Sequence, residues 1–117
     1  MSLPKIQDVQ TPEDFNQLLE QARVASELLK ALAHEGRLLI LCLLAEGEKS
    51  VSELEEAMHL PQAAVSQQLA RLRFDRLVTT RREGRVIYYS IASEEVSSVI
   101  ETLYKLFCAP VRRPKSE

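Results

Sequence analysis

The apolar residues switch from helical to strand-like spacing near residue 75, and this switch constrains the fold more than any other feature of the sequence. Before it, apolar side chains recur every three or four residues, which is the period of an amphipathic helix. Residues 77–82 and 85–91 are instead rich in Val, Ile, Thr and Tyr, and Glu83-Gly84 between them suits a two-residue hairpin turn with positive φ at the glycine. Residues 94–107 return to helical spacing. The chain is therefore predicted to be mainly α-helical with a small β-hairpin.

Two long helical patterns open the chain. The first covers residues 12–33, and Thr11 followed by Pro12 is typical of an N-terminal cap with proline in the first turn. The second covers residues 37–45, after a break at Gly36. Because this second stretch is apolar on every side, we expect it to form a central, buried helix.

Two further helices precede the hairpin. Either Ser50 or Ser52 could open a capping box, since each stands three residues before a glutamate. The short helix after them is expected to point inward the side chains of Leu54, Ala57 and Met58. The next helix, residues 62–73, has one apolar face made of Val65, Leu69 and Leu72. Its opposite face carries side chains short enough to approach the edge of a base, namely Gln62, Ala63, Ser66, Gln67, Ala70 and Arg71.

This order of elements is that of a winged helix-turn-helix. In such a unit the second helix enters the major groove of DNA, and the hairpin, or wing, lies along the backbone. The first and last helices have wide apolar stripes outside this unit, so we expect a homodimer through these two helices. A two-fold dimer would place its two reader helices about one DNA turn apart on a near-palindromic double-stranded operator.

The charge of the chain is unevenly distributed. The net charge is −2, but residues 61–92 hold six arginines against the two carboxylates of Asp75 and Glu83. Arginine offers a planar fork of donors that suits phosphate and guanine, so this local excess favours a nucleic-acid partner over a merely solvated arginine face. The tip of the hairpin carries three of these arginines, which are Arg81, Arg82 and Arg85.

Length and hydropathy exclude other classes of protein. The 117 residues suit a single domain with flexible ends at about residues 1–10 and 110–117. The longest apolar run, residues 38–45, is far shorter than the roughly 20 residues that a membrane span needs. The first ten residues have no apolar core of a secretion signal, so a cytoplasmic location without a membrane partner is expected.

Three stretches resemble the ArsR family of bacterial repressors: ALAHEGRLLIL at 31–41, QAAVSQQL at 62–69 and RREGRVIYY at 81–89. The resemblance implies a dimeric repressor, not an enzyme, that leaves its operator when an inducer alters it. It maps groove contacts onto Gln62, Ala63, Ser66, Gln67 and Arg71, and wing contacts onto Arg81, Arg82 and Arg85. One departure is Pro61, which stands where relatives commonly have a capping Ser or Thr.

Metal sensing is not expected. Where many family members have a Cys-x-Cys metal site, this chain has Ser50 and Ser52, and hydroxyls are poor zinc ligands compared with thiolates. The last helix has no histidine, and His34 and His59 are interpreted as helix-end or surface residues. We therefore predict neither a metal nor another cofactor.

The two cysteines, Cys42 and Cys108, stand 66 positions apart. In a cytoplasmic protein such a pair is either two inert thiols or a reversible redox switch. Chemistry alone favours an inert Cys42, since a thiol within an apolar stretch behaves as a small hydrophobe and burial raises its pKa. Cys108 ends a helix, where the helix dipole disfavours a thiolate.

The resemblance changes this balance. The chain looks like the sulfide-responsive, persulfide-sensing subgroup represented by BigR and SqrR, which has one cysteine in the central helix and one at the end of the last helix. It implies that Cys42 and Cys108 are the sensing pair, that reactive sulfur species are the inducer, and that bridging the pair releases DNA.

Three alternatives stay open at this point. The same fold could respond to general oxidants, nitrosating agents or a metal. The chain could be a thiol enzyme, although it has neither a Cys-x-x-Cys nor a Gly-rich turn that would support a thiol of low pKa. It could also be a winged helix that binds protein in place of DNA.

Overall fold

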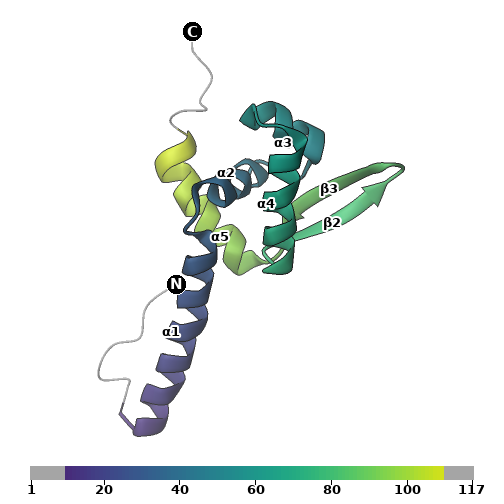
Figure 1. The fold of residues 1–117 in the computed structure, drawn as a ribbon. Coiled ribbons are helices and arrows are strands. Elements are labelled where there is room, and N and C mark those ends of the chain that lie inside the picture. Colours follow the sequence, from purple (N-terminus) through teal and green to yellow (C-terminus); the bar gives the residue numbers. More distant parts are fainter. Residues whose placement is uncertain (1–9, 110–117) are drawn as a thin grey trace. The chain divides into compact units, whose positions relative to one another are not determined.

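The computed structural model describes residues 10–109, and the ends predicted to be flexible lie outside this range except for Gln10. The elements follow in the order α1 (Pro12–Leu32), α2 (Glu35–Leu44), β1 (Lys49–Ser50), α3 (Val51–Met58), α4 (Gln62–Phe74), β2 (Val78–Glu83), β3 (Val86–Ile91), α5 (Glu94–Leu103) and a π-helical turn, η2 (Tyr104–Cys108). The chain divides into two compact units, Met1–Ala33 and His34–Glu117. Figure 1 labels the helices and the two hairpin strands.

The first unit consists of α1, whose beginning agrees with the sequence analysis. The Thr11 hydroxyl accepts a hydrogen bond from the Asp14 amide at 3.0 Å, and the Asp14 carboxylate accepts one from the Thr11 amide at 3.2 Å. This capping box, with Pro12 in the first turn, satisfies amides that a helix start leaves without partners. Several large apolar side chains of α1 are exposed in the single chain: Phe15, Leu18, Leu19, Val24 and Leu29.

The second unit is built around α2, as its apolar sequence predicts. Every residue from Ile40 to Leu44 is buried, and α2 contacts α4, α5 and β3. The helix begins at Glu35, two residues before the predicted start, so Gly36 lies inside its first turn. A β-carbon at Gly36 would approach the Gln68 side-chain nitrogen to 3.3 Å, a tight contact with the end of a flexible side chain of α4.

The helix-turn-helix follows the predicted packing with one correction. Ser50, not Ser52, caps α3 and forms the box with Glu53. Leu54 is fully buried and Met58 half-buried, but Ala57 is exposed, contrary to the prediction. The prediction failed because α3 packs along the line from Leu54 to Met58, which leaves Ala57 at the edge. In α4 the predicted apolar face is buried: Val65, Leu69 and Leu72.

The hairpin belongs to a three-stranded antiparallel sheet of order β1-β3-β2. Its register pairs Glu83 with Val86, so the turn is Gly84-Arg85 in place of the predicted Glu83-Gly84. The shift makes Gly84, with φ of +64°, the first of the two turn residues, a position at which a hairpin turn accepts a glycine with positive φ. The two-residue strand β1 is too short to leave a pattern in the sequence.

The last helix ends differently from a regular α-helix. Ser93 caps α5 by accepting a hydrogen bond from the Val96 amide at 3.2 Å, and Val96 and Ile100 are buried. From Tyr104 onward the backbone widens into the π-helical turn η2, which ends at Cys108, one residue beyond the span predicted to be helical. No helix in residues 10–109 is long and apolar enough to cross a membrane.

Candidate functional site

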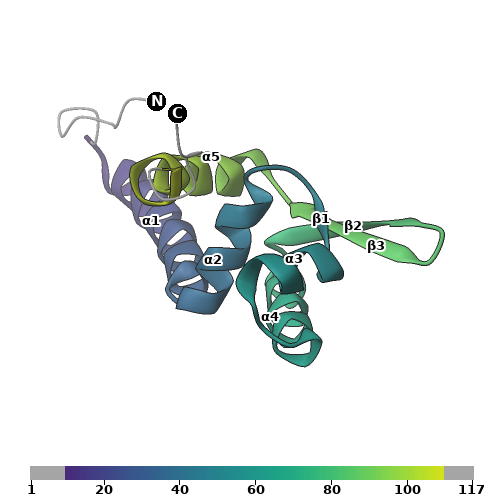
Figure 2. The same cartoon turned by 90° about the horizontal axis from the view of Figure 1, so that it is seen from above.

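The reader helix α4 presents the predicted polar face to solvent. Gln62, Ala63, Gln67 and Arg71 are exposed, and Ser66 is half-buried. The helix begins after Pro61, which provides no side-chain cap, as the departure from the family pattern indicated. All five predicted groove residues therefore lie on one helix that is anchored by its buried apolar face, and in Figure 2 this helix runs next to α3.

Arg71 is not a free cation. Its guanidinium donates to the Asp75 carboxylate at 3.2 Å and lies 5.9 Å from the centre of the Phe74 ring. Asp75 also accepts a contact from Arg37 at 3.5 Å, which fastens the start of α2 to the end of α4. Because the Arg71 side chain is mostly exposed, a competing phosphate could displace this ion pair at little cost.

The three wing arginines have different surroundings. Arg81 donates to both carboxylate oxygens of Glu48 at 2.9 Å, contacts Glu83 at 3.4 Å and stacks on Tyr88, 4.6 Å from the ring centre. Its hydrogen bond holds the pKa of Glu48 below the ordinary value. Arg82 and Arg85 are exposed, and neither has a hydrogen bond or an ion pair to any residue between 10 and 109. The role of Glu48 could not be predicted, because a lone glutamate in a loop gives no signal of its partner.

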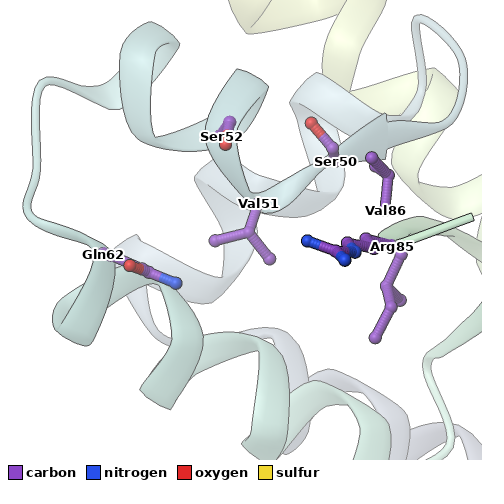
Figure 3. Close-up of a pocket in the computed structure, with 7 residues that line it drawn as sticks. Ser50, Val51, Ser52, Gln62, Arg85 and Val86 are labelled. Carbon is purple, nitrogen blue, oxygen red and sulfur yellow. The ribbon is translucent and has the colours of Figure 1, made fainter.

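A shallow pocket joins the reader helix to the wing. Its volume is about 280 Å³, and it is lined by Ser50, Val51, Ser52, Gln62, Arg85, Val86 and Ile87. Figure 3 shows the Arg85 guanidinium directed into the hollow, with Gln62 on the opposite side. The first residue of α4 and a cation of the wing therefore face the same space, which is the arrangement needed for one ligand to contact both.

The structure brings the two cysteines together. Cys42 is buried in α2, and Cys108 is half-buried at the end of η2. Burial, followed by a side-chain hydrogen bond and a Coulombic interaction with Cys108, raises the pKa of the Cys42 thiol to about 12. The sequence alone could not give this contact, because it depends on how α5 and η2 pack across α2.

Ser50, His34 and His59, the residues considered as metal ligands, all lie at helix ends. The Ser50 hydroxyl accepts the hydrogen bond of the Glu53 amide at 3.2 Å, while His34 and His59 are exposed and lie at helix ends. His59 ends α3 with φ of 55°. No cluster of three His, Cys, Asp or Glu side chains that could hold a metal ion occurs in the part of the chain that the structure describes.

Comparison with known proteins agrees with this geometry. The pattern of the family described as "Bacterial regulatory protein, arsR family" matches residues 34–80. The transcriptional activator HlyU of Vibrio cholerae serotype O1 is 44% identical over 97 residues, covering 83% of this chain and 90% of HlyU. The biofilm growth-associated repressor of Agrobacterium fabrum is 46% identical over 91 residues, covering 78% of each chain. The crystal structure of the repressor BigR from Xylella fastidiosa is similar with a TM-score of 0.77 at 36% identity, covering 86% of this chain and 98% of BigR.

The free wing cations give a first prediction. We expect Arg82→Gln to weaken binding to a mixed-sequence DNA duplex and to lower the slope of log affinity against log salt by about 0.9 for each phosphate that the variant no longer neutralises. Arg23→Gln, which removes an exposed arginine of α1 that is paired with Glu20, is the matched control and should leave the slope unchanged. Fluorescence anisotropy across a salt series measures both. An unchanged slope in Arg82→Gln would show that this arginine does not contact phosphate.

The unequal thiols give a second prediction. With a pKa near 12, Cys42 stays protonated at pH 7, and its thiolate fraction rises only as the pH approaches 12. A short iodoacetamide pulse on the native reduced protein at pH 7 should therefore label Cys108, the more exposed thiol, well before Cys42. Peptide mass spectrometry locates the label, and denatured protein should lose the difference. Equal labelling of both thiols in the native protein would contradict the observed burial.

Proposed function

The chain belongs to the ArsR family of bacterial regulatory proteins, and on this premise we propose that it is a transcriptional repressor whose operator affinity is set by the state of Cys42 and Cys108. The protein binds DNA when both thiols are reduced, and it releases DNA when sulfur atoms bridge the two cysteines. The strongest support for this proposal is that two cysteines far apart in the sequence contact each other in the structure. One of them, Cys42, lies in α2, which packs against the reader helix α4.

The DNA-binding part of the proposal uses the exposed face of α4 and the wing. Short side chains at the start of α4 reach base edges in a major groove; these are the polar Gln62, Ser66 and Gln67 and the methyl group of Ala63. Arg71 exchanges its exposed partner Asp75 for a phosphate or a base, since an ion pair of this kind contributes less than about 1 kcal/mol. Arg82 and Arg85 lie along the backbone, where their unpaired guanidinium groups neutralise phosphates.

The proposed repressor is a homodimer. Large apolar side chains are exposed on α1, such as Phe15 at 54%, and on η2, such as Phe107 at 68%. Exposed apolar surface of this kind marks an interaction site. A second copy of the chain would cover them, and its reader helix would then contact the other half of a near-palindrome. Repression follows where that operator overlaps a promoter, whereas the name of the Vibrio cholerae relative shows that a related chain can activate.

The proposed sensing step exchanges sulfur between thiols. The Cys108 thiolate attacks the outer sulfur of a low-molecular-weight persulfide and expels the corresponding thiol, which leaves a persulfide on Cys108. The Cys42 sulfur then loses its proton and attacks the inner sulfur of this persulfide, which expels hydrogen sulfide and forms the Cys42–Cys108 bond. In sum, the two thiols lose two electrons and two protons, and the reagent is reduced to one thiol and one hydrogen sulfide. If the Cys108 persulfide first attacks the outer sulfur of a second persulfide molecule, it expels a second thiol and gains one more sulfur; Cys42 then attacks the middle sulfur of this chain, expels hydrogen sulfide and leaves one bridging sulfur, which lengthens the reach by up to about 2 Å.

Bridging would change DNA affinity through the packing of α2. The bridge ties η2 to a helix that contacts both α4 and α5. At a dimer interface formed by α5 and η2, even a small displacement alters the separation of the two reader helices. A tenfold loss of operator affinity requires that the bridge favour the wrong separation by only about 1.4 kcal/mol.

The test is an operator titration at several salt concentrations. The operator is selected by the reduced protein from a random duplex library, and intact mass reports whether two hydrogen atoms are lost or further sulfur is gained. We expect the persulfide-treated protein to bind at least about tenfold more weakly than the reduced protein, and Cys42→Ser to keep its affinity after the same treatment. A peroxide-treated sample distinguishes a response to general oxidants. Equal affinities of reduced and bridged wild type would contradict the proposed switch.

A further inference from the structure

Arg81 spans the sheet on one face. In the antiparallel register Arg81 of β2 lies opposite Tyr88 of β3, and Tyr88 lies opposite Ser50 of β1. The Arg81 side chain crosses over the Tyr88 ring and reaches Glu48, which immediately precedes β1. Both carboxylate oxygens of Glu48 accept hydrogen bonds from this guanidinium, and Nη2 adds a further one. The wing is thereby fastened to the loop that leads from α2 into β1.

The same loop is held at its other end by the thiol-bearing turn. The Tyr104 hydroxyl donates to the Glu46 carboxylate at 3.0 Å, and Glu46 also pairs with Lys49 at 3.6 Å. Tyr104 is the first residue of η2 and Cys108 is its last. Loop 46–49, which runs through Gly47 to Lys49 at the start of β1, therefore contacts both η2, which carries Cys108, and β2, which carries Arg81 and Arg82.

We propose that Arg81 and Tyr104 are positioning residues that attach the wing and the thiol-bearing turn to loop 46–49, so that the wing follows the state of the cysteine pair. This inference rests on the proposed function. A bridge at Cys108 displaces η2, and Tyr104 then moves Glu46. Glu48, two residues along the loop, shifts with it and changes the angle at which the wing presents Arg82 and Arg85. Arg81 thus affects DNA binding through the wing and not through a phosphate contact of its own.

The partners of Arg81 favour a positioning role for this residue over a direct contact with DNA. Its guanidinium is already engaged by Glu48, Glu83 and the ring of Tyr88. The neighbouring Arg82 and Arg85 have no such partners among residues 10–109. A bidentate contact to carboxylate also fixes orientation more strongly than a single exposed ion pair does.

Glu48→Gln tests the role of Arg81. If Arg81 positions the wing, this substitution should weaken operator binding by the reduced protein by about fivefold, even though it removes a negative charge. The double variant Glu48→Arg with Arg81→Glu should recover most of the loss, because it restores the ion pair in reverse. Glu56→Gln removes an exposed carboxylate of α3 with no partner among residues 10–109, and it controls for charge. Stronger binding by Glu48→Gln, with no recovery in the double variant, would identify Arg81 as a phosphate contact and overturn its positioning role.

Tyr104→Phe tests the link to the thiols, because it removes only the hydroxyl that holds Glu46. The variant should form the bridge as wild type does, by intact mass, but its ratio of reduced to bridged operator affinity should fall at least threefold below that of wild type. Tyr89→Phe, a half-buried tyrosine on β3, is the matched control and should keep the wild-type ratio. An unchanged ratio in Tyr104→Phe, beside a clear ratio in wild type, overturns this inference alone. A wild-type ratio of one overturns the proposed function as well.

Discussion

The packing of α2 is the constraint on which the rest of the structure depends. Because the stretch from Ile40 to Leu44 is apolar on every side, it is stable only when other elements cover it completely, and α4, α5 and β3 do so. One helix therefore supports the reader helix, contacts the last helix and carries Cys42. A chemical change at this cysteine acts at the point where the elements of the second unit meet, and a closely packed core transmits such strain efficiently.

Electrostatics at the surface proposed to face DNA depends more on how the charges are paired than on their number. The net charge of −2 gives no indication of a nucleic-acid partner, and the local excess of arginine overstates the number of free cations. Arg71 and Arg81 are held by carboxylates, whereas Arg82 and Arg85 have no partner in the described residues. In the proposed complex the free pair neutralises phosphates, Arg71 exchanges Asp75 for DNA, and Arg81 orients the wing.

The sequence predicted what local chemistry determines. The N-terminal cap at Thr11, a capping box at Ser50 or Ser52, the buried face of α4 and the existence of the hairpin all follow from side chains a few positions apart. Features set by long-range packing escaped it: the short strand β1, the π-helical turn, the one-residue shift of the hairpin turn and the exposure of Ala57. The contact of Cys42 with Cys108 entered only through family resemblance, and the Arg81–Glu48 pair could not be foreseen, because nothing in either local sequence specifies its partner.

In the proposed switch, joining two neighbouring sulfurs drives the protein from DNA. The most direct measurement follows operator release by fluorescence and bridge formation by intact mass in one sample, after a persulfide is added to the reduced complex and again after a thiol reductant is added. Release should follow bridge formation with the same time course, and reduction should restore binding. A fully bridged protein that stays on its operator, or release that precedes the bridge, would contradict it.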